Sequence, residues 1–310
     1  MPTQTFPSPE AHAAAVQNSN LRIALLGRAC APWKMTSLAL GNLRVQWGQA
    51  GGGTDTKGAV SPGGVMLFVP TQNIPVMRMN GCRFDAQSFR LQVPGDELWL
   101  SSTDWHGWFS TFISNEILAE WRATDTSAIV PCSRFIRLPW ERAEAFRHVV
   151  AQLRSNVQRE PTAFESSVAL HTTARKLTEL VQGAILGPPT ATTQPGRHSL
   201  SRRQIVRVVM DSIDQQDGEY LTVADLASAA GVSERTLRTA FQEYFGMGPV
   251  RYLKLRTLNL IRKALQNADP SVTTVTGAAT SFGVWEWGRF AHEYQLLFGE
   301  LPSETLRHVR

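Results

Sequence analysis

Short apolar runs fill the first third of the chain. Between about residues 21 and 112 these runs are rich in β-branched and aromatic residues and are separated by Gly, Pro, Asn and Asp. This alternation is typical of strands joined by turns and predicts an antiparallel sandwich or barrel. The clearest candidate strands are Leu43–Trp47, Val65–Val69, Ser88–Val93, Glu97–Leu100 and Trp108–Ile113.

From Trp140 to Leu186 the apolar residues recur at helical spacing instead. One stripe comprises Phe146, Val149, Val150 and Leu153, and another comprises Leu170, Ala174, Leu177 and Val181. Two amphipathic helices are therefore predicted after the β-region. Packing on the β-domain and pairing with a second copy in a two-fold dimer would both bury these stripes, and the pattern alone does not choose between them.

Residues 187–199, GPPTATTQPGRHS, have the Pro, Thr and Gly content of an exposed linker. Beyond this segment the periodicity predicts helices at Arg202–Asp214, Val223–Ala230, Ser233–Phe245, Pro249–Asn267, Val275–Ser281 and Trp285–Phe298. The fold class is thus α+β with two domains. A disordered tail is expected at residues 1–20, a β-domain with two following helices at 21–186, the linker at 187–199 and an all-α domain at 200–310.

One pattern occurs twice in the helical region, at an offset of 52 residues before its turn and 53 after it. Before the turn, Thr222, Leu226, Ala227, Gly231 and Val232 match Thr274, Ala278, Ala279, Gly283 and Val284. After it, Phe241, Phe245, Gly246 and Pro249 match Tyr294, Phe298, Gly299 and Pro302. Small alanines and a turn glycine allow two helices to pack closely, so each unit is predicted to be a helix-turn-helix.

Two α-hairpins could also build a bundle that binds no DNA. The tandem arrangement favours DNA binding because the connecting helix, about 18 residues long, would span roughly 27 Å, close to the ~34 Å between successive major grooves. Charge supports this interpretation. The net charge is +5, and between Arg235 and Lys263 seven basic residues face one acid, Glu243, which is a segment suited to a phosphate backbone.

These residues resemble the C-terminal DNA-binding domain of AraC/XylS-type bacterial transcription regulators. The likeness runs from Arg202 to His308, through LTVADLASAAGVSERTLRTAFQEYFGMGPVRYLKLRTLNLIRKAL and FGVWEWGRFAHEYQLLFGELPSETLR. The preceding β-domain and helices are similar to the cupin-like sensory domain and dimerisation helices of such regulators. The resemblance implies a homodimer that binds double-stranded promoter DNA, responds to a small-molecule effector and usually activates transcription by touching RNA polymerase.

By position, the resemblance implies which residues contact DNA. The base-facing residues would be Arg235, Arg238 and Thr239 in the first unit and Trp287, Gly288, Arg289 and His292 in the second. Arginine suits guanine because its guanidinium can donate to O6 and N7 together. Phosphate contacts would come from Arg251, Lys254 and Arg256 and from helix-start amides near Thr222 and Thr274.

The second unit departs from the family pattern. Val284 replaces the usual Phe, Gly288 a Ser or Thr, His292 an Arg and Gln295 a Lys. The second helix is therefore expected to read bases more weakly than the first, since a histidine is only partly charged near pH 7.

Composition excludes several classes of protein. With 43% hydrophobic and 18% charged residues, the chain is globular, and its apolar runs fall short of the roughly 18–20 residues that cross a bilayer. Residues 1–19 lack the basic start of a secretory signal, so a cytoplasmic protein is expected. The three cysteines, Cys30, Cys82 and Cys132, suit neither a disulfide framework nor a metal cluster.

An enzyme is not predicted. The β-region has His106 as its one histidine, the chain has no His-x-His pair, and neither a phosphate-binding loop nor a Gly-x-Ser-x-Gly motif is present. No metal or cofactor is expected. An enzyme with an accessory helix-turn-helix is the less favoured alternative, as are a repressor and a regulator without an effector.

An aromatic cluster in the β-region is the candidate effector pocket, since small-molecule pockets combine aromatic walls with a few polar groups. The same residues could equally form an ordinary core. The candidates are Trp99, Trp105, His106 and Trp108, with Arg78 and Arg83 on a neighbouring segment.

Overall fold

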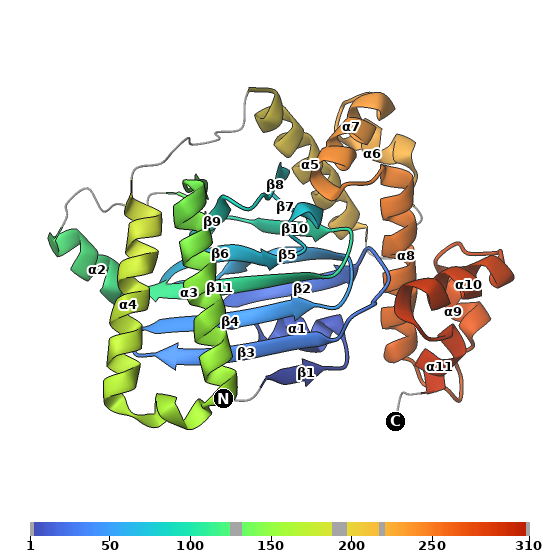
Figure 1. Cartoon of the computed structure of the whole chain (residues 1–310). Helices are drawn as coiled ribbons and strands as arrows, with labels where there is room; N and C mark the ends of the chain where they lie inside the picture. The colour runs from blue at the N-terminus through green and yellow to red at the C-terminus, as the bar shows by residue number, and fades with distance from the viewer. Residues whose placement is uncertain (1–2, 125–131, 188–196, 217–220, 308–310) are drawn as a thin grey trace.

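The computed structural model describes residues 3–124, 132–187, 197–216 and 221–307. Two antiparallel sheets form the N-terminal domain (Figure 1). The seven-stranded sheet has the spatial order β1 (Gln4–Phe6), β3 (Trp33–Leu40), β4 (Leu43–Ala50), β11 (His106–Ser114), β6 (Gly64–Gln72), β9 (Ser88–Gln92) and β12 (Arg134–Arg137). The five-stranded sheet has the order β2 (Ser19–Leu25), β5 (Thr54–Val60), β10 (Leu98–Ser102), β7 (Met77–Met79) and β8 (Cys82–Arg83). The expected α+β architecture is confirmed.

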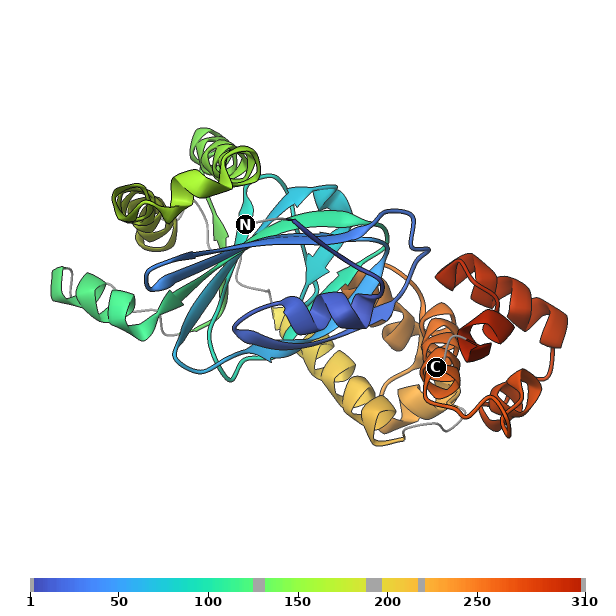
Figure 2. The same ribbon diagram turned by 90° about the horizontal axis from the view of Figure 1, so that it is seen from below.

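Strand β11 shows why both faces of the seven-stranded sheet are apolar. On one face Trp108 packs with Met35 and Phe68 between the two sheets. On the other, Phe109 and Ile113 pack against helices α3 (Trp140–Arg159) and α4 (Ser167–Leu186). The two predicted amphipathic helices therefore lie on the outer face of this sheet, as Figures 1 and 2 show. Helix α2 (Asn115–Thr124) follows β11, and short 3-10 turns occur at Ile74–Val76 and Pro161–Glu165.

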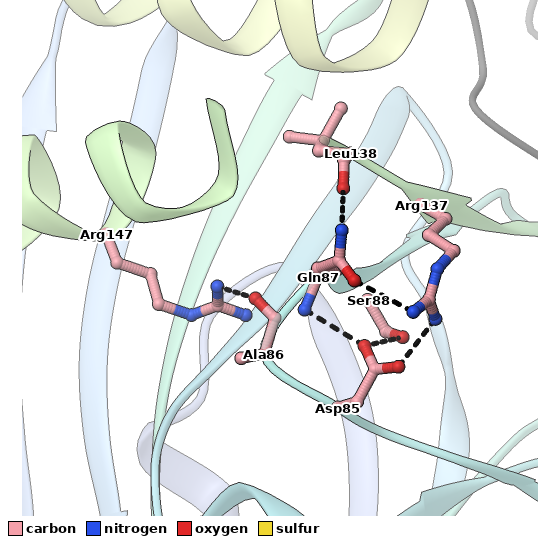
Figure 3. A network of polar contacts seen from close by, with 7 residues as sticks. All are labelled: Asp85, Ala86, Gln87, Ser88, Arg137, Leu138 and Arg147. Atoms are coloured by element: carbon pink, nitrogen blue, oxygen red, sulfur yellow. Dashed lines mark hydrogen bonds and ion pairs between the residues drawn. The ribbon is translucent and has the colours of Figure 1, made fainter. Parts of the chain in front are cut away.

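A polar network ties the turn before β9 to β12 and α3 (Figure 3). The Asp85 carboxylate accepts hydrogen bonds from Ser88 Oγ at 2.6 Å and from Arg137 Nη1 at 2.5 Å. Burial raises the pKa of Asp85, but these hydrogen bonds outweigh it and hold the pKa below its usual value. Arg147 of α3 donates to the carbonyl of Ala86 in the same turn. The network thus fixes α3 against the edge of the sandwich.

The expectation of a disordered tail at residues 1–20 is wrong. Residues 3–20 include β1, helix α1 (Pro9–Ala15) and the start of β2. Ser8 Oγ accepts a hydrogen bond from Ala11 N at 3.2 Å, and Pro9 occupies the first turn. His12, Ala13 and Val16 are buried against the sheets. A helix of seven residues with a histidine and alanines on its inner face is too short to show a hydrophobic stripe.

The C-terminal domain is entirely helical in its described residues. It comprises α5 (Arg197–Gln215), α6 (Val223–Ala229), α7 (Glu234–Phe245), α8 (Pro249–Gln266), α9 (Val275–Ser281), α10 (Trp287–Phe298) and α11 (Pro302–Arg307). The six predicted helices are found within a few residues of their expected bounds, and α11 was not predicted. Helix α4 ends at Leu186, and most of the expected linker, residues 188–196, lies outside the described residues.

The outer face of the five-stranded sheet is covered by the helical domain. Leu26 packs into the core of the first helix-turn-helix, and Leu25 packs with α8 and the second. Figure 2 shows α3 and α4 on one side of the sandwich and the helical domain at its other side and end, where Asp55 of β5 and Ser101 of β10 bond to that domain. The five-stranded sheet is therefore the wall between the inside of the sandwich and the helix-turn-helix units.

Candidate nucleic-acid interface

The first helix-turn-helix consists of α6 and α7. Thr222 and Asp225 form a capping box at the start of α6, in which Thr222 Oγ1 accepts from Asp225 N at 3.2 Å and Asp225 Oδ2 accepts from Thr222 N at 2.9 Å. The Thr222 hydroxyl also donates to Asp225 Oδ2 at 2.6 Å, and this bond together with the one from Thr222 N lowers the pKa of Asp225. Gly231 has φ +62° in the turn, a left-handed conformation that favours glycine. Buried Leu237 and Phe241 anchor α7.

The outward side of α7 carries the expected base-facing residues. Arg235, Arg238 and Thr239 are all exposed. Arg238 Nη2 lies 2.8 Å from Glu234 Oε2, and Thr239 Oγ1 donates to the Arg235 carbonyl at 3.0 Å. An exposed i,i+4 ion pair contributes only about 0.3–0.5 kcal/mol, so DNA can compete for the Arg238 guanidinium at little cost.

The second unit, α9 and α10, has the same framework. Thr274 Oγ1 accepts from Gly277 N at 3.0 Å, and Gly283 has φ +75° in the turn. Buried Ala279, Phe290 and Tyr294 form its inner side. Trp287, Gly288, Arg289 and His292, the residues expected to face bases, are exposed.

Arg289 is held within the domain. Its guanidinium lies 3.1 Å from Glu293 and 3.3 Å from Glu286, and both contacts raise its pKa. Lys254 of α8 pairs with the same Glu293. These four residues form an ion network between α8 and α10.

The expected phosphate contacts differ in their availability. Arg251 is exposed at the start of α8. Arg256, by contrast, donates to the carbonyls of Ile213 at 2.9 Å and Gln216 at 3.3 Å, so it satisfies the C-terminal end of α5. Lys254 is engaged by Glu293. Thr222 and Thr274 stand at helix starts, as expected.

Helix α8 is also the main link between the two domains. Tyr252 Oη donates to Asp55 Oδ2 at 2.6 Å in a buried contact with β5. Asn259 bonds the main chain of Leu25 twice, accepting from its N–H at 3.0 Å and donating to its carbonyl at 2.9 Å. Burial raises the pKa of Asp55, while Lys57 and the Tyr252 hydroxyl act in the opposite direction. Two side chains seven residues apart on α8 thus hold the five-stranded sheet.

Helix α7 adds a second set of interdomain contacts. Ser101 Oγ of β10 donates to the Tyr244 carbonyl at 2.5 Å, and the rings of Trp99 and Tyr244 meet edge to face at 6.4 Å. Lys57 also pairs with Asp214 of α5 at 3.3 Å. These contacts leave the outward sides of α7 and α10 uncovered.

A cavity of about 50 Å³ lies between the two sheets. None of the residues that line it carries a formal charge, and most are apolar. Its polar groups come from His12, Ser19, Thr54, Thr56, His106 and Ser110. Within the described residues, His12 Nδ1 and Ser19 Oγ are buried without a hydrogen-bond partner.

The six residues expected to form an effector pocket do not come together, and this corrects the sequence interpretation. His106 and Trp108 line the cavity. Trp99 packs against Tyr244, Arg78 lies beside Gly246, and Arg83 donates to the Pro75 carbonyl at 3.0 Å. The carbonyl of Trp105 accepts a hydrogen bond from Asn73 at 2.7 Å. Alternation along β10 explains the difference, since Leu98 and Leu100 face the cavity and Trp99 points the other way.

Sequence reasoning missed His12, Ser19, Tyr252 and Asn259. His12 and Ser19 belong to the segment expected to be disordered. Tyr252 and Asn259 lie on α8, whose apolar stripe already explains its packing inside the helical domain. An asparagine at a half-buried helical position is the signal that could have indicated a partner outside that domain, since a buried amide needs hydrogen bonds.

Acid is expected to destabilise the sandwich through His12 and His106. Burial lowers the pKa of each to about 4 from 6.5. The neutral forms therefore stabilise the fold above about pH 6.5, and this stability is lost as the pH falls toward 4, by about 3 kcal/mol per histidine over the whole window. Urea unfolding of the β-domain at pH 7 and pH 5 measures the loss. His106→Gln should flatten the dependence and the exposed-site control His292→Gln should not; equal slopes in all three proteins would contradict the assignment.

Within the described residues no helix is long and apolar enough to cross a bilayer, and no group of His, Cys, Asp and Glu is placed to hold a metal ion.

Comparison with known proteins agrees with the geometry of the helical domain. A model of a helix-turn-helix domain matches residues 226–308. The probable thc operon regulatory protein of Rhodococcus erythropolis is 43% identical over 105 residues, which are 34% of this chain and 32% of that protein. The XylDLEGF operon transcriptional activator 3 of Pseudomonas putida is 36% identical over 34% of this chain and 31% of its own length. The chain thus spans about a third of these curated relatives.

Among solved structures, a probable AraC family transcriptional regulator from Rhodopseudomonas palustris CGA009 is 36% identical over 34% of this chain and 97% of its own, with a TM-score of 0.31. The AraC-like transcriptional activator CuxR is 14% identical, with a TM-score of 0.42 over 89% of this chain and 98% of its own. The relatives are transcription regulators and not enzymes. Both the paired helix-turn-helix units and these identities place the chain in the AraC/XylS family.

Proposed function

We propose that this protein is a sequence-specific DNA-binding transcription regulator controlled by a small molecule. The observation that carries the proposal is the pair of helix-turn-helix units joined by α8, an 18-residue helix, with the outward sides of α7 and α10 exposed. At about 1.5 Å per residue, α8 spans roughly 27 Å, a length that suits two adjacent major grooves.

We propose activation as the direction of control, because relatives such as the XylDLEGF operon transcriptional activators of Pseudomonas putida are activators. An activator would bind promoter DNA and contact RNA polymerase in the cytoplasm. The test is transcription in vitro from the protein's own upstream promoter with purified polymerase. Added protein should increase the transcript, whereas a decrease would identify a repressor and no change at any effector concentration would count against regulation of that promoter.

Helices α3 and α4 are proposed to form a homodimer interface. Although both pack on the seven-stranded sheet, Trp140 is 54% exposed, Val149 41% and Val168 74%. Exposed large apolar side chains on paired helices are typical of self-association. Light scattering should give twice the monomer mass, and Val149→Glu should halve it; a monomeric wild-type protein would leave packing on the sheet as their whole role.

The proposed effector is small, uncharged and largely apolar, and it would enter the cavity between the sheets. Its lining offers apolar walls and no charged group, while His12 Nδ1 and Ser19 Oγ need a partner that such a ligand's polar group could supply. A cavity of about 50 Å³ is far smaller than ordinary ligand pockets of roughly 300 Å³ or more. Binding would therefore push the five-stranded sheet outward.

That sheet would carry the signal to the helical domain. Thr54 and Thr56 of β5 face the cavity, and Asp55 between them holds Tyr252 of α8 on the other side. A shift of β5 caused by a ligand would move the attachment of α8 and change the orientation of the two DNA-reading helices. Ligand binding and domain arrangement would then be thermodynamically linked.

Removing the α8 attachment should uncouple the domains. In the double variant Tyr252→Phe, Asn259→Ala, three interdomain hydrogen bonds are lost and Asp55 stays buried without Tyr252; each unpaired buried group costs roughly 1–3 kcal/mol. Calorimetry should show one cooperative unfolding transition for the wild-type protein and two for the variant.

A compound that stabilises the protein, found in a panel of uncharged small molecules, should raise the melting temperature of the single wild-type transition. In the variant, the same compound should raise the melting temperature of only one of the two transitions.

Arg251→Ala, on the exposed side of α8, is the matched control and should keep the single transition. A single transition in the double variant would contradict the coupling through α8. Failure of every compound to raise the wild-type melting temperature at saturating concentration would favour a regulator without an effector.

A further inference from the structure

The two recognition helices present opposite kinds of chemistry. Helices α7 and α10 both have 12 residues and align at an offset of 53. In this alignment Gly288 stands in the place of Arg235 and Ala291 in the place of Arg238. The two arginines that can read guanine in the first unit therefore have no counterpart in the second.

Arg289, the arginine of α10, already forms ion pairs within the domain. Arg289 lies within 3.3 Å of Glu286 and within 3.1 Å of Glu293, and Glu293 also pairs with Lys254. Removing Arg289 from this network would leave Glu293 with Lys254 alone. A guanine contact from Arg289 would therefore have to replace two ion pairs, whereas a contact from Arg238 replaces one.

A pair of indole rings stands at the start of α10, with Trp285 just before the helix and Trp287 at its first position. Trp285 is 69% exposed and Trp287 39% exposed, and their ring centroids lie 6.3 Å apart. By contrast Trp33, Trp47 and Trp108 are at most 7% exposed. Such a pair leaves much apolar surface in water, which is unfavourable unless a partner covers it.

The space in front of the pair is open. A Cβ built on Gly288 would meet no atom within 4 Å. The side-chain-free surface of Gly288, directly after Trp287, lets a DNA base edge approach the start of α10 closely.

We propose that Trp285 and Trp287 read thymine through its C5-methyl group, the main apolar feature of the major groove. This inference rests on the proposed DNA binding and adds the base preference of the second helix-turn-helix unit. The first unit would select guanine by hydrogen bonds and the second would select thymine by apolar contact. The preferred site would carry guanines in one major groove and thymines in the next, about 10 base pairs away.

The test starts with selection of binding sites from random duplex DNA by the full-length protein. In the selected site, thymines are then replaced by deoxyuridine, which lacks only the methyl group, separately in each half. For the wild-type protein, substitution in the half contacted by α10 should weaken binding about fourfold per methyl lost, the equivalent of one buried methyl group. For Trp285→Ala, Trp287→Ala, the same substitution should have no effect.

Val208→Ala, at an exposed apolar position of α5, is the matched control, and it should keep the wild-type response to deoxyuridine. Melting temperatures of the variants verify that they fold. Tolerance of deoxyuridine by the wild-type protein, or a second half-site without thymine, would overturn the inference while leaving DNA binding intact. Failure to select any site would instead count against the proposed function. Unchanged DNA binding of the double variant with loss of transcription would assign the indoles to a protein partner and overturn the inference as well.

Discussion

Replacing Arg235 and Arg238 together with alanine is expected to weaken specific DNA binding by roughly a hundredfold or more. Both side chains are exposed on the outward side of α7, and a bidentate arginine–guanine contact is worth about 1–3 kcal/mol of discrimination. Competition titration with the selected site and with random DNA measures the loss. The specific affinity should fall toward the nonspecific level, because the lost contacts discriminate between bases.

The histidine of the second unit provides the comparison. His292 stands at the position of Thr239, and an imidazole lacks the fork of donors with which a guanidinium binds guanine O6 and N7 together, so His292→Ala should cost less affinity than Arg238→Ala alone. Equal losses for these two variants would contradict the assignment of guanine reading to α7. Retention of full specificity by the arginine double variant would contradict it more directly.

Phe241→Ala is expected to lower the free energy of unfolding of the helical domain by about 3–5 kcal/mol. Phe241 of α7 is fully buried in the core of the first helix-turn-helix, with its ring centroid 5.1 Å from that of Phe245 and 5.4 Å from that of Tyr252. A cavity at this position removes packing on Tyr252, the side chain that holds Asp55. The variant should therefore lose DNA binding and weaken the contact between domains.

Urea unfolding monitored by circular dichroism measures this change. The next residue, Gln242, is exposed, so Gln242→Ala should change the stability by no more than about 0.5 kcal/mol. A loss below about 1 kcal/mol in Phe241→Ala would mean that the first unit does not depend on this core, and the account of its packing would be wrong.

The helical domain could be predicted in detail from the sequence because its signals are local. Turn glycines such as Gly231 and Gly283, helix caps such as Thr222, and buried aromatics at repeated spacing all act over a few residues. Because the helix-turn-helix pattern occurs twice in the chain, each of these signals appears twice. Even the exposed positions of Arg235, Arg238 and His292 follow from helical periodicity once Leu237 and Phe290 are placed inside.

The β-domain and its cavity could not be predicted to the same depth, since strand pairing is long-range. Strands β2 and β5 pair across 35 or so residues of chain, and the sequence of β5, TDTKGAV, shows no alternation of apolar and polar residues. The direction of Trp99, toward Tyr244 and away from the cavity, depends on which face the helical domain occupies. Composition carries no information on that choice.

Contacts between domains were the other hidden feature. Asp55 and Tyr252 lie 197 residues apart in the chain. Asn259 bonds the main chain of Leu25, so the Leu25 side chain does not take part in this contact. One sequence cannot indicate such pairs, because each residue alone has an ordinary explanation in its own domain. The structure thus adds the route by which the sandwich could influence DNA binding.

The most direct test of the central claim is binding of the full-length protein to its own upstream DNA, at two salt concentrations and with excess competitor. Specific contacts survive competition, and phosphate contacts appear as a fall in affinity with salt. The account predicts binding that resists competitor and weakens at higher salt. Binding that competitor abolishes, both on this DNA and on fragments covering the whole genome, with and without candidate effectors, would contradict it.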